Sequence, residues 1–202
     1  MKRITNCSFV LIFWLGVFST GYAQETWPPV FEIKTDSGRL KVDPAYFQIL
    51  EDTANTYTFE EVRQLSPAFR FETHNDSKPN AHTCWIRMQV KNALPHDLNV
   101  YFCDFNASFM DLYWLDTNQR WQHQRTGEMV PKSQIPDRNG NKEQNRLFLH
   151  LQPGQQITLY QRSEIAFWFP PLNYLSPSFQ TEEDLIHSAY KALRIDTIWE
   201  NF

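Results

Sequence analysis

The feature that most constrains the fold is a succession of short strand-like segments that begins at residue 84. Turn residues separate the segments at 92–95, 116–118, 137–141 and 152–155. The predicted strands are 84–91, 98–105, 109–115, 120–126, 146–151, 156–163 and 170–175. No helices alternate with them, so the pattern predicts an all-β fold, an antiparallel β-sandwich or jelly roll.

Two short helices are expected beside these strands. Thr58 and Glu61 have the spacing of a capping box, in which a hydroxyl and a carboxylate cap the first turn of a helix. Near the C-terminus, three acidic residues at 182–184 precede an amphipathic pattern, which is typical of a helix start. The sequence therefore predicts a sandwich domain over 24–180, with a short N-terminal helix, and a helical tail over 181–202.

Residues 1–23 have the three parts of a secretory signal peptide. Lys2 and Arg3 supply the positive start, residues 9–18 are an apolar stretch, and 21–23 form a small-x-small cleavage site. The apolar stretch is shorter than the roughly 20 residues that a spanning helix needs. We expect export to the periplasm or medium and a mature chain that begins at Gln24; a retained signal anchor is the alternative.

The two cysteines of the mature chain are expected to be free thiols. In 84–90 the even positions are apolar, and in 98–105 the apolar positions are also even. Because strand side chains alternate between faces, Cys84 and Cys103 are predicted to point to opposite sides of one sheet. A β-bulge could reverse this parity, which leaves a disulfide as the alternative.

Several classes of chemistry lack their motifs. Only four glycines follow residue 23, and there is no G-x-G-x-x-G, P-loop or G-x-S-x-G sequence. The six histidines do not have metal-ligand spacing, so we expect no metal and no cofactor. A net charge of −4 argues against nucleic acid as a partner. Carboxylate pairs such as Asp104 with Asp111 leave a glycosidase as an alternative.

A candidate ligand face follows from the same parity argument. If 84–91, 98–105 and 109–115 form one sheet, their odd positions share a face. That face would gather aromatic and polar side chains, namely Trp85, Arg87, Gln89, Tyr101, Asp111 and Tyr113. Aromatic rings beside hydrogen-bonding groups suit a sugar or another polar ligand. The alternative is that residues 24–80 cover this face, with Arg87 ion-paired beneath them.

Residues 83–92, Thr-Cys-Trp-Ile-Arg-Met-Gln-Val-Lys-Asn, form a strand that resembles a family motif. In this strand a tryptophan, an apolar residue and an arginine follow one another at 85–87, and an asparagine ends the strand at a turn. It is similar to the type 2 extracellular sensor domain of bacterial seven-transmembrane receptors with diverse intracellular signalling modules (7TMR-DISM). Further features match in order over about 40–180, at 49–52, 58–62, 110–115, 126–127, 148–154, 157–160 and 170–172.

The resemblance implies a periplasmic jelly roll, similar to carbohydrate-binding modules, that senses a small-molecule or carbohydrate ligand. It carries over Trp85 and Arg87 and no catalytic residue. Such receptors continue into seven membrane helices, whereas this sequence ends at Phe202. The chain is thus expected to be either a truncated receptor, with membrane contact only through the missing helices, or a free soluble binder. A secreted carbohydrate-active enzyme and an adhesive module remain the alternatives.

Overall fold

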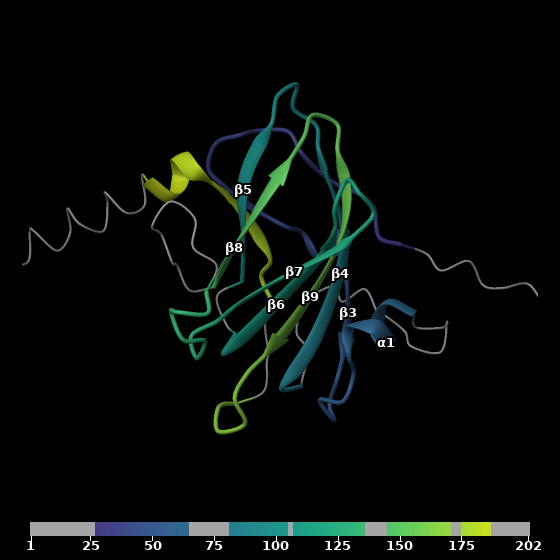
Figure 1. Ribbon diagram of the computed structural model, residues 1–202, viewed down its shortest axis with the longest axis vertical. Coiled ribbons are helices and arrows are strands. Elements are labelled where there is room, and N and C mark those ends of the chain that lie inside the picture. Colours follow the sequence, from purple (N-terminus) through teal and green to yellow (C-terminus); the bar gives the residue numbers. More distant parts are fainter. Residues whose placement is uncertain (1–26, 65–80, 105–106, 136–144, 171–174, 187–202) are drawn as a thin grey trace, which may run out of the picture.

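Two β-sheets face each other in the computed structural model, which describes residues 27–64, 81–104, 107–135, 145–170 and 175–186 (Figure 1). The larger sheet contains β1 (Phe31–Ile33), β3 (Phe47–Glu51), β4 (Thr83–Asn92), β6 (Phe109–Leu115), β7 (Trp121–Thr126) and β9 (Gln156–Glu164). The smaller sheet contains β2 (Arg39–Lys41), β5 (Leu98–Cys103), β8 (Arg146–Leu151) and β10 (Ser178–Thr181). The prediction of an all-β sandwich is confirmed.

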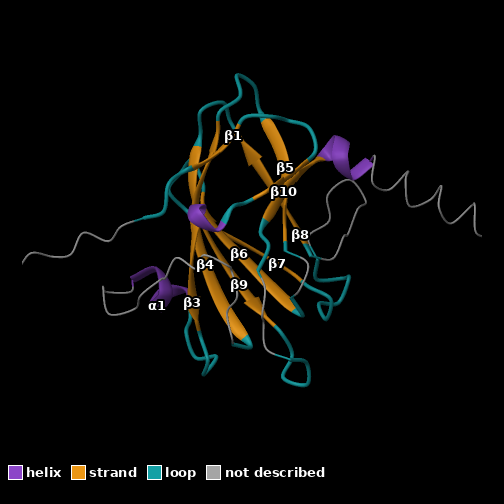
Figure 2. Cartoon of the chain, turned by 180° about the vertical axis from the view of Figure 1, so that it is seen from behind, coloured by secondary structure: helices purple, strands orange, loops and turns teal. Residues whose placement is uncertain are grey.

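The strand order in each sheet departs from the order in the chain. The larger sheet runs β1-β4-β9-β6-β7, with β3 on the same edge of β4 as β1. The smaller sheet runs β2-β10-β5-β8, and Figure 2 shows it from behind with β10 beside β5. Among the described strands, the β1–β4 pair is parallel and the other pairs are antiparallel.

The core lies between the two sheets and follows the predicted alternation. Cys84, Ile86 and Met88 of β4 point inward and are at most 1% exposed. From the smaller sheet, Phe102 and Phe179 meet with ring centroids 5.3 Å apart in an edge-to-face contact. A period-two apolar pattern therefore identifies the inner face of each strand correctly.

The prediction that 84–91, 98–105 and 109–115 form one sheet is wrong. β5 belongs to the smaller sheet, where it lies between β10 and β8. β4 and β6 are not neighbours either, because β9 pairs with both of them. The last described strand is β10, and the predicted strand 170–175 lies partly outside the described residues.

Helices occur where the capping pattern predicts them. α1 spans Phe59–Gln64, and Thr58 and Glu61 make the two reciprocal capping hydrogen bonds. Residues 182–186 are helical, whereas 187–202 and the predicted signal peptide lie outside the described residues. In the described part of the chain, no helix is both long and apolar enough to cross a membrane.

Cys84 and Cys103 are both free, as predicted, and both are buried. The prediction that they point to opposite sides of one sheet is wrong, because Cys84 is on the inner face of β4 in the larger sheet and Cys103 is on β5 in the smaller sheet. The Cys103 thiol lies 3.4 Å from the side-chain oxygen of Gln180 on β10. Burial raises the pKa of each thiol from 9.0 to about 12.

The thiols are expected to resist labelling until the protein unfolds. For the chain without residues 1–23, a thiol reagent at about pH 8 should label two thiols in denaturant and none in the folded protein. Because the folded pKa is raised, the stabilisation that each protonated thiol contributes is complete below pH 9 and declines between pH 9 and about 12. A count of zero in denaturant without reductant would reveal a disulfide.

Candidate ligand-binding face

The outer face of the larger sheet carries two rows of side chains that cross its strands. Strand register places one row from β3 to β7, consisting of Gln48, Arg87, Tyr160, Tyr113 and His123. The neighbouring row consists of Leu50, Trp85, Arg162, Asp111 and Arg125. Four of the five predicted site residues, Trp85, Arg87, Asp111 and Tyr113, therefore do share one face. We call it the outer face.

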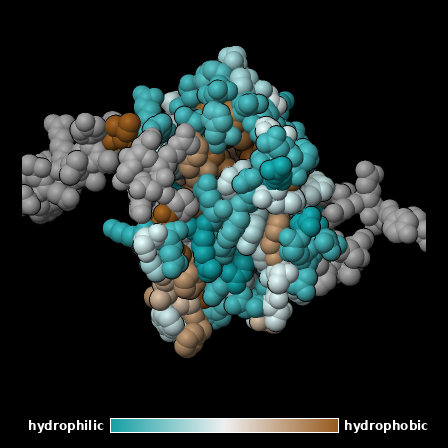
Figure 3. Space-filling view, viewed as in Figure 1, coloured by the Kyte–Doolittle hydropathy of each residue, from teal (hydrophilic) through white to brown (hydrophobic). Residues whose placement is uncertain are grey.

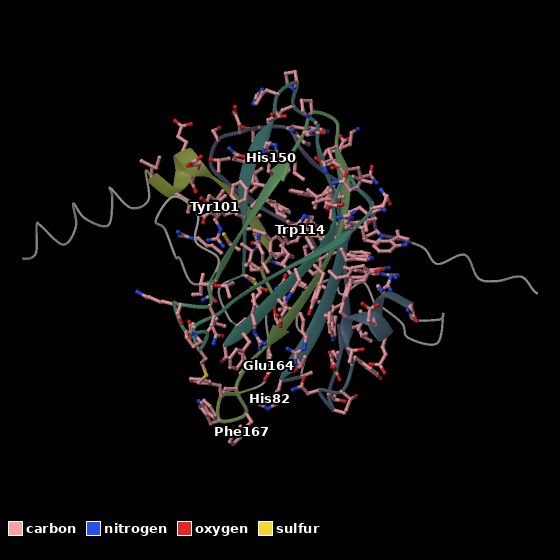
Figure 4. All side chains as sticks on the ribbon, in the orientation of Figure 1. His82, Tyr101, Trp114, His150, Glu164 and Phe167 are labelled. Atoms are coloured by element: carbon pink, nitrogen blue, oxygen red, sulfur yellow. The ribbon has the colours of Figure 1, made fainter. Side chains whose placement is uncertain are left out.

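Tyr101, the fifth predicted residue, lies elsewhere. It belongs to β5 in the smaller sheet, where its Cα partners are Phe148 and Gln180. Its ring meets the Phe148 ring edge-to-face, with centroids 5.4 Å apart. Figure 4 labels Tyr101 and His150 in the upper half of the molecule, on β5 and β8. The grouping of Tyr101 with Trp85 was wrong because it assumed that β5 pairs beside β4.

A cover of aromatic residues packs over part of the outer face. Trp27 meets Tyr160 edge-to-face at 6.0 Å, and Phe59 of α1 stacks on Tyr113 with centroids 4.1 Å apart. Beneath this cover, Trp85 is 1% exposed and Arg87 is 4% exposed. Within the described residues, Trp27 and Phe59 thus supply the cover that the alternative expected over Trp85 and Arg87, and the partners of Arg87 include the Gln48 amide and the Trp27 ring.

Arg87 is held by neighbours on the covered side. Its Nε donates to Oε1 of Gln48 at 2.8 Å, and its guanidinium lies 4.5 Å from the ring centroid of Trp27. An amide acceptor and a ring face both stabilise a buried guanidinium. Arg87 therefore links β4 to β3 and to the N-terminal segment.

Asp111 lies at the centre of the part of the outer face that Trp27 and α1 do not cover, which we call the uncovered side. His123 Nε2 lies 2.8 Å from its Oδ1, and Arg125 Nε lies 3.7 Å from the same oxygen. An Arg162 nitrogen lies 3.5 Å from Oδ2. The Asp111 side chain is 6% exposed, whereas those of His123 and Arg125 are each 46% exposed. A buried carboxylate thus positions two side chains that solvent can reach.

Tyr113 connects the covered and uncovered sides. Its ring stacks on Phe59 on one side and on His123 on the other, the latter with centroids 4.5 Å apart and planes 13° apart. Burial and the nearby Asp111 carboxylate raise the pKa of Tyr113 to about 12. Its hydroxyl therefore keeps its proton at physiological pH and is available as a hydrogen-bond donor.

The pair Asp104 and Asp111 does not form a glycosidase site. The Asp104 carboxylate accepts a hydrogen bond of 2.7 Å from Gln161, which pairs with the inward-facing Ile86 and Leu112. Asp111 points to the outer face. The sheet thus lies between the two carboxylates, although a glycosidase needs both around one sugar bond. In the described part of the chain, no cluster of three or more metal-ligating side chains occurs.

The sequence reasoning missed several members of the outer face. Tyr160, Arg162, His123 and Arg125 all come from β7 and β9, whose positions in the sheet were not predicted. Trp121 at the start of β7 also joins the aromatic cluster, 5.0 Å from Phe59 and 5.8 Å from Tyr160. The alternation of aromatic and basic residues at 121, 123 and 125 was the available signal.

Comparison with known proteins gives one family. A family model described as 7TMR-DISM extracellular 2 matches residues 44–166, which is more than half of the chain. The matched region runs from η1 (Pro44–Tyr46) through β9 and includes β3, β4, β6, β7 and β9, the strands that carry the two rows of the outer face. A search of curated proteins gives no match.

Proposed function

Because the chain belongs to the 7TMR-DISM extracellular 2 family, we propose that it is a non-catalytic sensor domain that binds a small polar ligand, a carbohydrate or a related compound. The family supports the sensor role and an extracytoplasmic location. We further propose that residues 1–23 act as the cleaved signal peptide, so that the exported chain begins at Gln24.

The ligand is proposed to bind on the uncovered side of the outer face. The observation that carries this proposal is that His123 and Arg125 are half-exposed and are held over the buried carboxylate of Asp111. Side chains that are fixed before binding lose little conformational entropy when a ligand arrives. Trp121 adds an aromatic ring beside these polar groups, and Tyr113, whose two ring faces are already covered by Phe59 and His123, adds its hydroxyl. An aromatic ring beside hydrogen-bonding groups is an arrangement that favours a sugar.

Trp85 and Arg87 have a supporting part in this proposal. Both lie beneath Trp27 and the α1 segment, so a ligand on the uncovered side would not touch them directly. Trp85 lies 6.0 Å from Tyr113, centroid to centroid. We propose that these two residues hold the rings and cations of the site in place, and that Tyr101 has no part in it.

The test is a glycan and small-metabolite screen, followed by calorimetry on matched variants. His123→Ala should weaken binding of a hit by about 1–3 kcal/mol, roughly five- to 150-fold in Kd. His150→Ala is the control, because His150 is an exposed histidine on the smaller sheet that pairs with Asn99. Tyr113→Phe and Tyr101→Phe form a second pair, of which only the first should lose affinity.

If His123→Ala and Tyr113→Phe bound the ligand as tightly as the wild-type protein does, the ligand site would not be on the outer face. Circular dichroism and thermal unfolding of each variant separate a lost contact from a lost fold. Arg125→Lys adds a further check, since an ammonium cannot reproduce the planar fork of a guanidinium. A ligand with a carboxylate or with paired hydroxyls should lose affinity in this variant.

A further inference from the structure

One loop exposes three consecutive aromatic side chains. Phe167 is 82% exposed, Trp168 is 58% exposed and Phe169 is 49% exposed. They follow β9, in a sequence that reads Ala-Phe-Trp-Phe-Pro over 166–170. The core, by contrast, buries its large apolar residues almost completely. Exposure of three adjacent large rings is costly in water and calls for a partner.

The base of this loop is anchored, so the exposure is a fixed property of the fold. The Phe169 N–H donates to the carbonyl of Ala166 at 2.9 Å, which closes a four-residue turn. Ala166 is buried, and its own N–H donates to Oγ of Ser108 at 3.1 Å. Ile165 donates to the carbonyl of His82 at 2.8 Å. The rings therefore project from a rigid support.

A second loop adds an apolar side chain to the same region. Met129 is 42% exposed, and its N–H donates to the carbonyl of Ser108 at 3.0 Å. Ser108 thus anchors both loops, one through its backbone and one through its hydroxyl. We call Met129, Phe167, Trp168 and Phe169 the apolar tip.

The position of the apolar tip suits a flat partner. The view in Figure 1 has the longest axis of the molecule vertical, and the loop after β9 reaches its lower end. Figure 4 labels Phe167 below Glu164 and His82 at that extremity, and apolar surface gathers there in Figure 3. An end-on projection can touch a planar surface before the rest of the molecule does.

The angles between the three rings of the loop favour lipid chains over a sugar as the partner. The planes of Phe167 and Trp168 differ by 78°, and those of Trp168 and Phe169 differ by 44°. Rings at such angles form no flat stacking platform, whereas insertion among lipid chains does not need coplanar rings. Tryptophan and phenylalanine are also the residues that typically lie at the boundary between headgroups and acyl chains.

The charge around the loop fits the same partner. Between 164 and 170 the one charged residue is Glu164, and its carboxylate pairs with Arg162 at 2.6 Å. The loop therefore brings no uncompensated charge toward an apolar medium. The loop of Met129 adds Glu128 and Lys132, one charge of each sign. Residues 164–170 also contain no basic residue, so binding through this loop would not depend on attraction to anionic lipids.

From these observations we propose that the apolar tip inserts into the interfacial region of a lipid bilayer. The contact is shallow and depends on apolar area rather than on charge. The inference is independent of the ligand proposed for the outer face, since side chains of β6 and β7 form that site and none of them belongs to the tip.

Sedimentation with phosphatidylcholine vesicles tests the proposal on the exported chain. Wild-type protein should bind, and the triple variant Phe167→Ser, Trp168→Ser, Phe169→Ser should partition about tenfold more weakly or worse. Ile186→Ser is the matched control, because Ile186 is a large apolar residue that is 54% exposed outside the tip. It should bind as wild type does.

Brominated phosphatidylcholine gives a position-specific readout. Bromine in the upper acyl chain should quench part of the tryptophan fluorescence of wild type, and this part should disappear in Trp168→Phe, which still sediments with vesicles. Failure of the wild type to bind, binding that persists in the triple variant, or binding only to anionic vesicles at low salt would each overturn the proposal. Tip-dependent self-association in analytical ultracentrifugation without vesicles would assign the tip to a second copy and overturn it equally.

Discussion

Replacing Trp85 by alanine should lower the free energy of unfolding by about 3–5 kcal/mol. The indole is 1% exposed and packs with Leu50, Val62 and Tyr160 in the cluster beneath the aromatic cover. Its removal leaves a cavity between β4 and the α1 segment that surrounding side chains fill only partly. Urea unfolding followed by far-ultraviolet circular dichroism measures the change.

Trp168→Ala is the matched control for this experiment. Trp168 is 58% exposed at the loop tip, so its removal should change the free energy of unfolding by less than about 0.5 kcal/mol. If both variants had the same midpoint of urea unfolding as the wild-type protein, Trp85 would not contribute to the stability of the fold. Its burial under Trp27 and Phe59 would then be a cover that opens easily.

Gly127→Ala should destabilise the protein by about 3 kcal/mol or more. Gly127 has a φ of +140°, and a Cβ built there would overlap the carbonyl oxygen of Ser108 and lie 2.8 Å from Cα of Phe109. Both partners are backbone atoms, so they cannot rotate away. Thermal and urea unfolding of the purified variant test this expectation.

Gly38→Ala separates backbone strain from this close contact. Gly38 also has a positive φ, of +80°, but among the described residues no atom beyond its two chain neighbours lies within 4 Å of a Cβ at that position. The variant should lose only about 1 kcal/mol through strain. Equal losses in the two variants would contradict the close approach between Gly127 and Ser108.

Local features of the fold could be read from the sequence. The alternation of apolar residues along β4 identifies its inner face because strand side chains have a period of two. The capping box at Thr58 predicts the start of α1 because its hydrogen bonds join residues three positions apart. Each of these signals lies within a few residues of the structure that it predicts.

Strand pairing could not be read in the same way. β9 lies between β4 and β6, although it follows β6 by about forty residues in the chain. The local pattern of a strand does not indicate which other strand it pairs with. This one error moved Tyr101 onto the wrong sheet and left Tyr160 and Arg162 out of the predicted site. A cover over this face by residues 24–80 was the stated alternative, and Trp27 and Phe59 of that range do pack over it.

The three stacked rings of Phe59, Tyr113 and His123 restrict how two parts of the molecule can move. The ring planes are 3° and 13° apart, at centroid separations of 4.1 and 4.5 Å. Rings in van der Waals contact resist compression along their common normal, but parallel faces slide past each other at little cost. The stack therefore resists approach of α1 toward the edge strand β7, while the edge-on contact of Phe59 with Trp121, 5.0 Å away, is what opposes sliding between them.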